Sequence, residues 1–226
     1  MRIFIKTDAN EIIGYGHLQR CLNLAEILKK NHEIIFLFCS TPNLILKEVK
    51  KKFKIIKFKD NKSILQKVKK FHNKKNLNFL ILDDYSVNYD WEKAISTYFS
   101  KVLVIGDHLD RKHYCNFYLN QNVIGKKSKK DLSKKLSTAK CLLGPKYALL
   151  DKNYLKYSNK KKKRTSLKNI IISFGGSDRE NLTAKTLDVL SQNKFSKFNI
   201  KVAIGKNYKY FNELVKKHKT NKKIIF

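Results

Sequence analysis

Short apolar runs that alternate with segments of helical periodicity are the feature that most constrains how this chain can fold. Runs of strand length at residues 3–5, 34–39, 79–82 and 102–105 are apolar at every position rather than at every second one. Between them, apolar residues recur three and four positions apart, which is the spacing of an amphipathic helix. Strands that are apolar on both faces and alternate with helices form a parallel sheet with helices on each side. The sequence therefore predicts an α/β fold.

A glycine turn follows the first of these strands. Gly14 and Gly16 precede a helix expected at about 17–30, and glycine lets the backbone turn sharply and approach a ligand closely. The N–H groups at the start of a helix attract an anion. His17 and Arg20 are three residues apart, so they share one face of that helix. For this stretch alone, a tight turn without a ligand and a solvated or capping histidine are the alternatives.

Acidic residues and a tyrosine follow the ends of several predicted strands. In open α/β sheets, ligands bind beyond the carboxyl ends of the strands. By this rule Asp8, Asp83, Tyr85 and Asp107 belong to the same edge of the sheet as the glycine turn. The alternative for each aspartate is that it caps the helix that follows it.

A second, shorter copy of the strand, glycine turn and helix design begins near residue 168. The strand at 169–174 leads into a glycine turn and a helix to about 192, and another strand, a helix and a strand-like stretch reach Phe226. Before it the pattern weakens, and residues 126–135 and 159–164 are basic and poor in apolar residues. The second basic run indicates a linker. The expected divisions are a catalytic lobe at 1–158, a linker at 159–167 and a partial nucleotide-binding lobe at 168–226.

The charge of the chain is strongly positive, with 50 Lys and Arg against 18 Asp and Glu and a formal net charge of +32. Such a charge attracts acidic partners, nucleic acids included. The excess is nearly all lysine spread along the chain together with many Asn, Ile and Phe residues, a mixture that codon bias toward A and T also produces. RNA-binding surfaces group aromatic and basic residues, whereas these aromatics occupy strand and helix positions. We expect no nucleic-acid partner, and RNA binding is kept as an alternative class.

The cysteines and the hydropathy pattern bear on cofactors and compartment. The four cysteines are far apart and form no Cys-x-x-Cys pair, so they indicate neither a zinc site nor a disulfide framework. The first apolar run is too short for a signal peptide, and no apolar stretch approaches the ~20 residues that span a bilayer. We therefore expect a cytoplasmic protein with no membrane partner, metal or cofactor.

Several short motifs run in a fixed order from residue 2 to about 192, and they are specific in combination. They are Gly14-Tyr15-Gly16-His17-x-x-Arg20, Asp83-x-Tyr85, Asn120-Gln121-Asn122, Leu143-Gly144-Pro145-x-Tyr147-Ala148-Leu149 and Ser173-Phe174-Gly175-Gly176-Ser177-Asp178. Together they resemble the nucleotide-sugar hydrolases of pseudaminic acid biosynthesis and the related spore-coat polysaccharide biosynthesis proteins.

The resemblance implies two Rossmann-like lobes, as in glycosyltransferase-B folds, and an enzyme that passes a sugar to water. The implied reaction releases UDP from UDP-2,4-diacetamido-2,4,6-trideoxy-β-L-altropyranose with inversion at C1. His17 is implied as the general base, a role that suits an imidazole, and Tyr85 as the second catalytic residue, which positions the reacting groups. The implied substrate-binding residues are Gly14, Gly16, Arg20, Asp83, Gly175, Gly176, Ser177 and Asn181. The last four are expected near the nucleotide, with the substrate between the lobes, and a glycosyltransferase of the same fold is the alternative.

The second lobe is expected to be incomplete. About 60 residues follow the linker, where a nucleotide-binding lobe needs roughly 100–150. The resemblance implies that relatives continue into a turn with glycine and serine and a glutamate that grips the uridine. We therefore expect an inactive or weakly active truncated hydrolase, with poor solubility or pairing with another chain through an open sheet edge.

Overall fold

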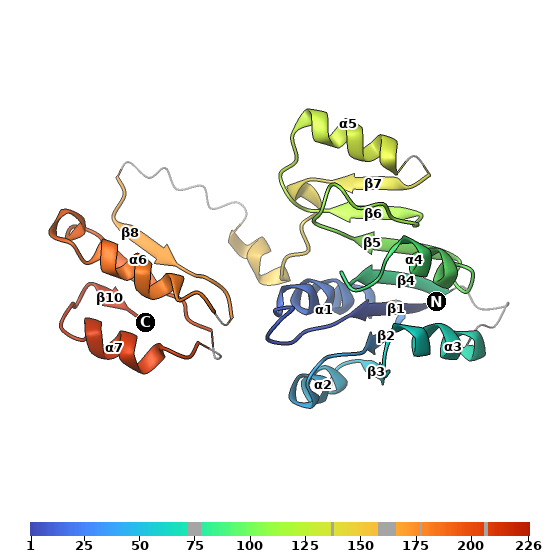
Figure 1. The fold of residues 1–226 in the computed structure, drawn as a ribbon, viewed down its shortest axis with the longest axis horizontal. Coiled ribbons are helices and arrows are strands. Elements are labelled where there is room, and N and C mark those ends of the chain that lie inside the picture. The colour runs from blue at the N-terminus through green and yellow to red at the C-terminus, as the bar shows by residue number, and fades with distance from the viewer. Residues whose placement is uncertain (72–77, 137, 158–165, 177, 206–207) are drawn as a thin grey trace. The chain divides into compact units, whose positions relative to one another are not determined.

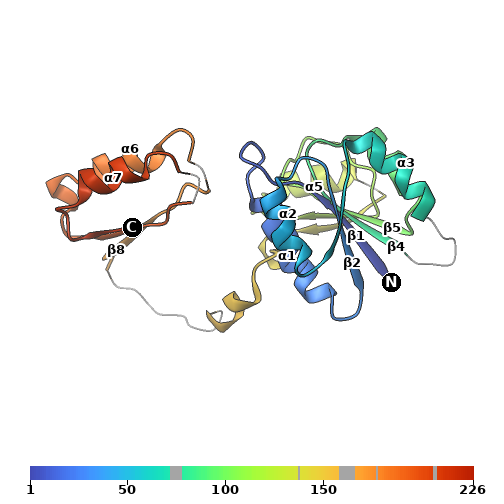
Figure 2. The same ribbon diagram turned by 90° about the horizontal axis from the view of Figure 1, so that it is seen from below.

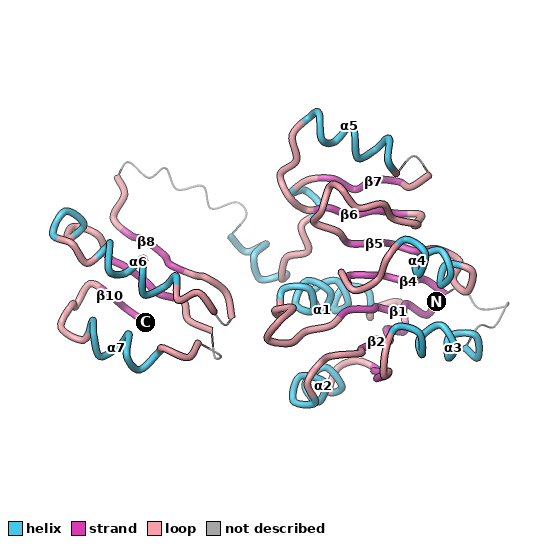
Figure 3. Tube along the Cα trace, viewed as in Figure 1, coloured by secondary structure: helices cyan, strands magenta, loops and turns pink. Residues whose placement is uncertain are grey.

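The computed structural model describes residues 1–71, 78–136, 138–157, 166–176, 178–205 and 208–226. The chain divides into two compact units, Met1–Tyr157 and Ser158–Phe226. Strands and helices alternate along most of the chain in both units (Figure 3), and only the strands Lys101–Ile105 and Phe117–Asn120 follow one another without a helix among the described residues. Of the predicted linker at 159–167, only residues 166–167 belong to the described part of the chain.

The first unit is a parallel sheet of seven strands in the order β3-β2-β1-β4-β5-β6-β7 (Figure 1). The strands are β1 Arg2–Thr7, β2 Glu33–Phe38, β3 Lys54–Lys57, β4 Asn78–Asp83, β5 Lys101–Ile105, β6 Phe117–Asn120 and β7 Lys140–Leu143. The helices are α1 Gly16–Leu28, α2 Asn43–Lys50, α3 Asn61–Phe71, α4 Tyr89–Ser96 and α5 Lys126–Lys135, with short 3-10 turns at Pro145–Tyr147 and Lys152–Tyr157.

A hydrophobic core lies on each face of this sheet, because successive side chains of a strand point to opposite faces. Ile3 and Ile5 of β1 pack with buried residues of α1 and α2, whereas Phe4 packs with Ile64 of α3 and Ile95 of α4 on the other face. Figure 2 shows α1 and α2 on one side of the sheet and α3 on the other. Both faces are covered, which explains why these strands are apolar at every position.

The strand order reverses direction between β1 and β4. The chain winds outward from β1 through β2 to β3, and then outward on the other side from β4 through β5 and β6 to β7. Strands β1 and β4 are direct neighbours, with Ile5 in register with Ile81 and Thr7 with Asp83. Their following loops therefore diverge at the carboxyl edge, and this topological switch point is where an open α/β sheet binds its ligand.

The basic stretch at 126–135, where the sequence pattern weakens, forms α5. Lysine is a good helix former, and two leucines spaced four apart anchor the element. Leu132 is 1% exposed and Leu136 is 2% exposed, and both belong to the core on the α3 and α4 side. Two buried leucines thus hold a helix whose other positions are largely charged.

The second unit contains a three-stranded parallel sheet in the order β10-β9-β8. Its elements are β8 Asn169–Ile172, α6 Leu182–Leu190, the 3-10 turn Asn193–Phe195, β9 Asn199–Val202, α7 Phe211–His218 and β10 Ile224–Ile225. Leu187 of α6 and Leu214 of α7 pack with Ile200 and Val202 of β9 in a separate core. The helix α6 begins later than its sequence suggests, because the Asp178 carboxylate accepts the first N–H groups of the helix, from Leu182 and Thr183.

We predict that Gly106→Ala destabilises the first unit. Gly106 follows β5, and a Cβ at this position would lie 2.6 Å from Oη and 2.8 Å from Cε2 of Tyr118, whose side chain is fully buried. The free energy of unfolding in urea should fall by about 1–3 kcal/mol. Gly16→Ala is the matched control, since among the described residues no atom outside the neighbouring backbone would lie within 4 Å of a Cβ at this position, and alanine favours a helix. A similar loss in both variants would contradict this account.

Candidate active site

Side chains from the start of α1 and from the ends of β4 and β5 meet at the switch point. His17 and Arg20 belong to the first two turns of α1, Asp83 ends β4, and Tyr85 and Asp107 follow β4 and β5. These residues are linked by hydrogen bonds or ring contacts. These five residues therefore lie together at the carboxyl edge of the sheet, as the sequence predicts for this edge.

The loop before α1 is built by Asn10. Its side-chain oxygen accepts the N–H groups of Ile12 and Ile13, both at 2.9 Å, and its carbonyl accepts the N–H of Gly14 at 2.8 Å. Gly14 has a φ of 83°, which glycine adopts without steric cost. The turn ends where α1 begins at Gly16. The side chain of the N-cap residue, Tyr15, makes no capping hydrogen bond to the helix.

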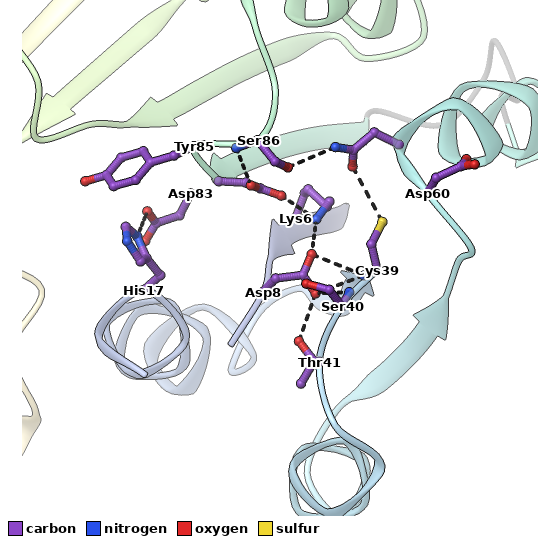
Figure 4. A network of polar contacts seen from close by, with 12 residues as sticks. Lys6, Asp8, His17, Cys39, Ser40, Thr41, Asp60, Asp83, Tyr85 and Ser86 are labelled. Carbon is purple, nitrogen blue, oxygen red and sulfur yellow. Dashed lines mark hydrogen bonds and ion pairs between the residues drawn. The ribbon is translucent and has the colours of Figure 1, made fainter. Parts of the chain in front are cut away.

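His17 is held by Asp83. The two atoms Nδ1 of His17 and Oδ1 of Asp83 are 2.7 Å apart, and the Asp83 side chain is fully buried. Figure 4 shows His17 beside Asp83 and across from Tyr85. Because a carboxylate can only accept, this contact requires the proton of a neutral His17 to be on Nδ1. Within the described residues no hydrogen-bond partner is found for Nε2, which is then the proton acceptor.

Arg20 connects the two aspartates of the site. Its Nε and Nη2 atoms donate to Oδ2 and Oδ1 of Asp83, both at 2.6 Å, and Nη1 donates to Asp107 at 2.9 Å. Nη2 also lies 3.1 Å from Nδ1 of His17. Since Nη2 already donates to the same oxygen as Nδ1, this last contact follows from the shared acceptor. The guanidinium fork is thus occupied by protein carboxylates.

Tyr85 covers the histidine. Its ring meets the ring of His17 edge-on, with centroids 4.6 Å apart, and the ring of His108 at 4.9 Å. Its hydroxyl donates to Oδ2 of Asp107 at 2.5 Å. Tyr85 is 40% exposed, so it can contact a bound molecule while it keeps this hydrogen bond.

The opposite charges of the site stabilise the ionised forms of Asp107 and Arg20, which burial alone would disfavour. Burial alone raises the pKa of Asp107, but the hydrogen bond from Tyr85 and the charge of Arg20 outweigh it and lower the pKa below its ordinary value. Burial alone lowers the pKa of Arg20, and its bonds with Asp83 and Asp107 raise it overall. Burial and then Asp107 raise the pKa of Tyr85. At neutral pH the site therefore holds an ionised Asp107, an ionised Arg20 and a protonated Tyr85.

A second charged cluster consists of Lys6, Asp8 and Asp84, and Figure 4 shows Lys6 in contact with Asp8. The Lys6 side chain is fully buried, and its Nζ is 2.6 Å from Oδ2 of Asp8 and 2.5 Å from Oδ2 of Asp84. Asp8 also accepts the N–H groups of Cys39 and Ser40. The cluster thereby ties together the loops that follow β1, β2 and β4. Asp8, which the sequence places on the site edge, fastens these loops and does not contact His17.

The predicted nucleotide-binding residues belong to the second unit. Gly175 has a φ of 82°. Gly176 lies close to Gly205, because a Cβ added at Gly205 would be 2.1 Å from the carbonyl oxygen of Gly176. The side-chain oxygen of Asn181 accepts the hydroxyl of Tyr208 at 2.5 Å. Ser177 lies outside the described residues. The first N–H groups of α6 donate to the Asp178 carboxylate, which therefore caps this helix.

Three parts of the site have no role in the sequence-based hypothesis. They are Lys6 with Asp84, the ring of His108 beside Tyr85, and Asn122, which the sequence gives only as part of a motif and whose side chain donates to Asp107 at 3.1 Å. A lysine that follows the apolar residues 3–5 and precedes Asp8 is a detectable signal of the cluster, since a buried lysine needs a carboxylate partner. The partner Asp84 is 78 residues away, and no local pattern indicates it.

No protein-family model matches the chain. The chain is 33% identical to an uncharacterised protein of Methanocaldococcus jannaschii, over 99% of this chain and 47% of that protein. It is 26% identical to the UDP-2,4-diacetamido-2,4,6-trideoxy-beta-L-altropyranose hydrolase of Campylobacter jejuni, over 86% of this chain and 67% of the hydrolase. The chain thus spans about half the length of the first relative, and it is a distant homologue of a nucleotide-sugar hydrolase.

The fold is similar to that of a solved structure, the MurG protein of Acinetobacter baumannii. The TM-score is 0.55 with 10% sequence identity, over 97% of this chain and 63% of the MurG chain. This likeness and the parallel sheet confirm the predicted α/β class with Rossmann-like lobes of the glycosyltransferase-B kind. At this identity the comparison bears on the fold alone.

Among the described residues, no group of three or more His, Cys, Asp or Glu side chains is arranged to hold a metal ion. None of the helices in that part of the chain has the length and apolar character needed to cross a membrane.

We predict that Lys6→Met strongly destabilises the first unit. The change leaves Asp8 and Asp84 buried without their cation, and the removal of one partner from a buried ion pair costs about 3–5 kcal/mol. Urea unfolding measures it. Lys54→Met is the matched control, because Lys54 also makes an ion pair at 2.6 Å but is 73% exposed, and exposed pairs contribute up to about 1 kcal/mol. Equal effects of the two changes would show that the cluster is not a stabilising element.

We also predict that the contribution of the Lys6 cluster to the free energy of unfolding depends on pH. The pKa of Asp84 is lowered from 3.8: burial raises it, but Lys6 more than offsets this. Its contribution is therefore present above that value and is lost as pH falls through the folded-state pKa. The pKa of Lys6 is raised above 10.5: burial lowers it, but Asp84 and Asp8 outweigh this, so its contribution is lost only at higher pH. The stability difference between wild type and Lys6→Met should be largest at neutral and mildly alkaline pH and should shrink as pH falls, because the carboxylates left buried without a cation in the variant become protonated more readily.

Proposed function

We propose that this chain carries the catalytic site of a nucleotide-sugar hydrolase. The observation that carries the proposal is the contact of His17 with buried Asp83, which leaves Nε2 as a proton acceptor beside a partly exposed tyrosine at the switch point. A histidine oriented by a carboxylate is a recurrent form of general base. The homology to a hydrolase that acts on a UDP-sugar supports the same class.

The proposed reaction is a single displacement at the anomeric carbon. A water oxygen forms a bond to C1 while the bond from C1 to the phosphate oxygen breaks, and the electron pair leaves with UDP. One water proton passes to Nε2 of His17. Because the water attacks from the face opposite to the leaving group, the configuration at C1 inverts. A diphosphate is a good leaving group, so its departure needs no protonation in this scheme.

The residues of the sequence-based hypothesis take different parts in this reaction. We assign His17 as the general base and Tyr85 as a positioning group for the water or the sugar. Arg20 and Asp83 were expected to bind substrate, but Asp83 is 1% exposed and the Arg20 fork is occupied. Their contacts support a role in orienting His17 instead.

The glycines keep their proposed roles in binding. Gly14 and Gly16 shape the turn at which α1 begins, where the first N–H groups favour an anionic or polar group. Gly175, Gly176, Ser177 and Asn181 are proposed to contribute to the nucleotide site of the second unit. The proposed substrate class is a UDP-linked 2,4-diacetamido-2,4,6-trideoxy sugar in a surface-polysaccharide pathway such as pseudaminic acid biosynthesis, acted on in the cytoplasm.

The experiment is to incubate the chain with a panel of UDP- and CDP-linked diacetamido sugars and follow release of the nucleoside diphosphate. The chain is assayed as it stands and with the C-terminal part of the M. jannaschii relative appended, because it spans 47% of that protein. Hydrolysis in H₂¹⁸O should place the label on C1 of the sugar. Turnover that requires an added acceptor would instead identify a glycosyltransferase, and absence of release from every member of the panel would overturn the proposal.

We predict that His17→Asn abolishes most hydrolysis while substrate binding persists. Loss of a general base lowers kcat by about 10²–10⁴-fold, whereas the sugar and nucleotide contacts remain. The measurements are kcat from UDP release and Kd from calorimetry. His32→Asn is the control, because His32 lies beyond the other end of α1, and it should leave kcat unchanged. Normal turnover of His17→Asn would mean that another group is the base.

A further inference from the structure

Asp107, which lies in the loop after β5, accepts hydrogen bonds from three residues. Tyr85 donates to its Oδ2 at 2.5 Å, Arg20 donates to both oxygens at 2.9 and 3.1 Å, and Asn122 donates to Oδ1 at 3.1 Å. Its side chain is 26% exposed. All three neighbours are donors, which matches a carboxylate that can only accept.

The hydrogen bond from Tyr85 decides what the tyrosine can offer to a ligand. A phenol has a single proton, and here that proton lies between the tyrosine oxygen and Asp107. The oxygen then has only its lone pairs for a further partner. A bound molecule therefore meets Tyr85 as an acceptor, and it must present a donor such as water, a hydroxyl or an amide N–H.

We propose that Asp107 is a positioning residue that holds the hydroxyl proton of Tyr85, so that the tyrosine oxygen faces the reacting group as a hydrogen-bond acceptor. This inference rests on the proposed hydrolase function and deepens it. In that reaction His17 Nε2 and the Tyr85 oxygen are two acceptors for one water. The water donates one hydrogen bond to each, a lone pair of its oxygen attacks C1, and only the proton on the His17 side is transferred, to Nε2.

The charged neighbours of Tyr85 favour this arrangement. Asp107 comes from the loop after β5, as does His108, and His17 and Arg20 come from α1. Burial and Asp107 raise the pKa of Tyr85, whereas Arg20 lowers it by less. Burial raises the pKa of Asp107, but the hydrogen bond from Tyr85 and the charge and hydrogen bonds of Arg20 outweigh it and hold this pKa below its ordinary value. At neutral pH the proton therefore belongs to the tyrosine and the charge to the aspartate.

The first experiment locates this proton without any substrate. The ultraviolet titration of each protein is compared with the same protein carrying Tyr85→Phe, and the difference isolates the ionisation of Tyr85 from the other tyrosines. In wild type, Tyr85 should ionise above the ordinary value of about 10. In Asp107→Asn its pKa should fall by about one unit or more, because a neutral amide no longer opposes the phenolate.

Matched variants separate this effect from a general disturbance of the site. Asn122→Ala removes another donor to Asp107 but keeps the carboxylate, and it should leave the titration of Tyr85 unchanged. Asp107→Glu keeps an acceptor of the same charge, and Tyr85 should still ionise above its ordinary value. If Asp107→Asn fails to fold, Asp107→Glu and wild type still test the prediction, since ionisation of Tyr85 at its ordinary value in both would overturn it.

The second experiment is a double-mutant cycle on turnover. Asp107→Asn and Tyr85→Phe should each lower kcat by about 10- to 100-fold, with a smaller change in KM. The double variant should be no slower than Tyr85→Phe, because Asp107 acts through the tyrosine hydroxyl. Asp107→Glu should recover part of the rate lost in Asp107→Asn.

The outcomes of the two experiments are distinguishable. Additive losses of kcat in the cycle, or an unchanged Tyr85 titration in Asp107→Asn, would overturn the role of Asp107. If no nucleotide sugar is hydrolysed, the proposed function fails, while the titration still decides whether Asp107 holds the tyrosine proton.

Discussion

The buried carboxylate of Asp83 is the constraint on which the site depends. An unpaired charge at this depth is strongly unfavourable, so the fold must supply cations and donors around it. Arg20 donates to both of its oxygens, and His17 approaches one of them at 2.7 Å. The requirement to satisfy Asp83 thereby fixes the rotation of α1 against β4. It also fixes which nitrogen of His17 carries the proton, and one buried charge thus sets both packing and chemistry.

The parallel sheet makes this arrangement possible because it brings the ends of distant segments to one edge. β1 and β4 are neighbours although their paired residues, such as Thr7 and Asp83, are 76 positions apart in the sequence. Two ionic clusters lie where the ends of β1 and β4 meet. One joins α1 to the ends of β4 and β5, and the other uses Lys6 to join the loops after β1, β2 and β4. Adjacent residues Asp83 and Asp84 serve different clusters, because successive side chains of an extended chain point to opposite sides.

The sequence predicts the elements of this fold better than the contacts of the site. Continuous apolar runs indicate a covered parallel sheet, and the strand-end rule brings Asp83, Tyr85 and Asp107 to the edge with His17. The helix α5 lacks a sequence signal because two leucines suffice to anchor it. The partners of Lys6 are also beyond sequence reasoning, since Asp84 is 78 residues away. Asp83 is 1% exposed, and no local pattern in the sequence indicates that a neighbouring helix encloses this strand-end carboxylate.

The charge of the site contrasts with the charge of the chain. The whole sequence carries a formal +32, yet the two clusters combine four carboxylates, Asp8, Asp83, Asp84 and Asp107, with the cations Lys6 and Arg20. Four negative and two positive groups leave a formal −2 while His17 is neutral. These two clusters offer no net positive charge to a diphosphate, whose proposed site is in the second unit, and the Arg20 fork is occupied by Asp83 and Asp107. In the proposed reaction this field suits the anomeric carbon, where positive charge develops, and it favours departure of the anionic leaving group away from His17.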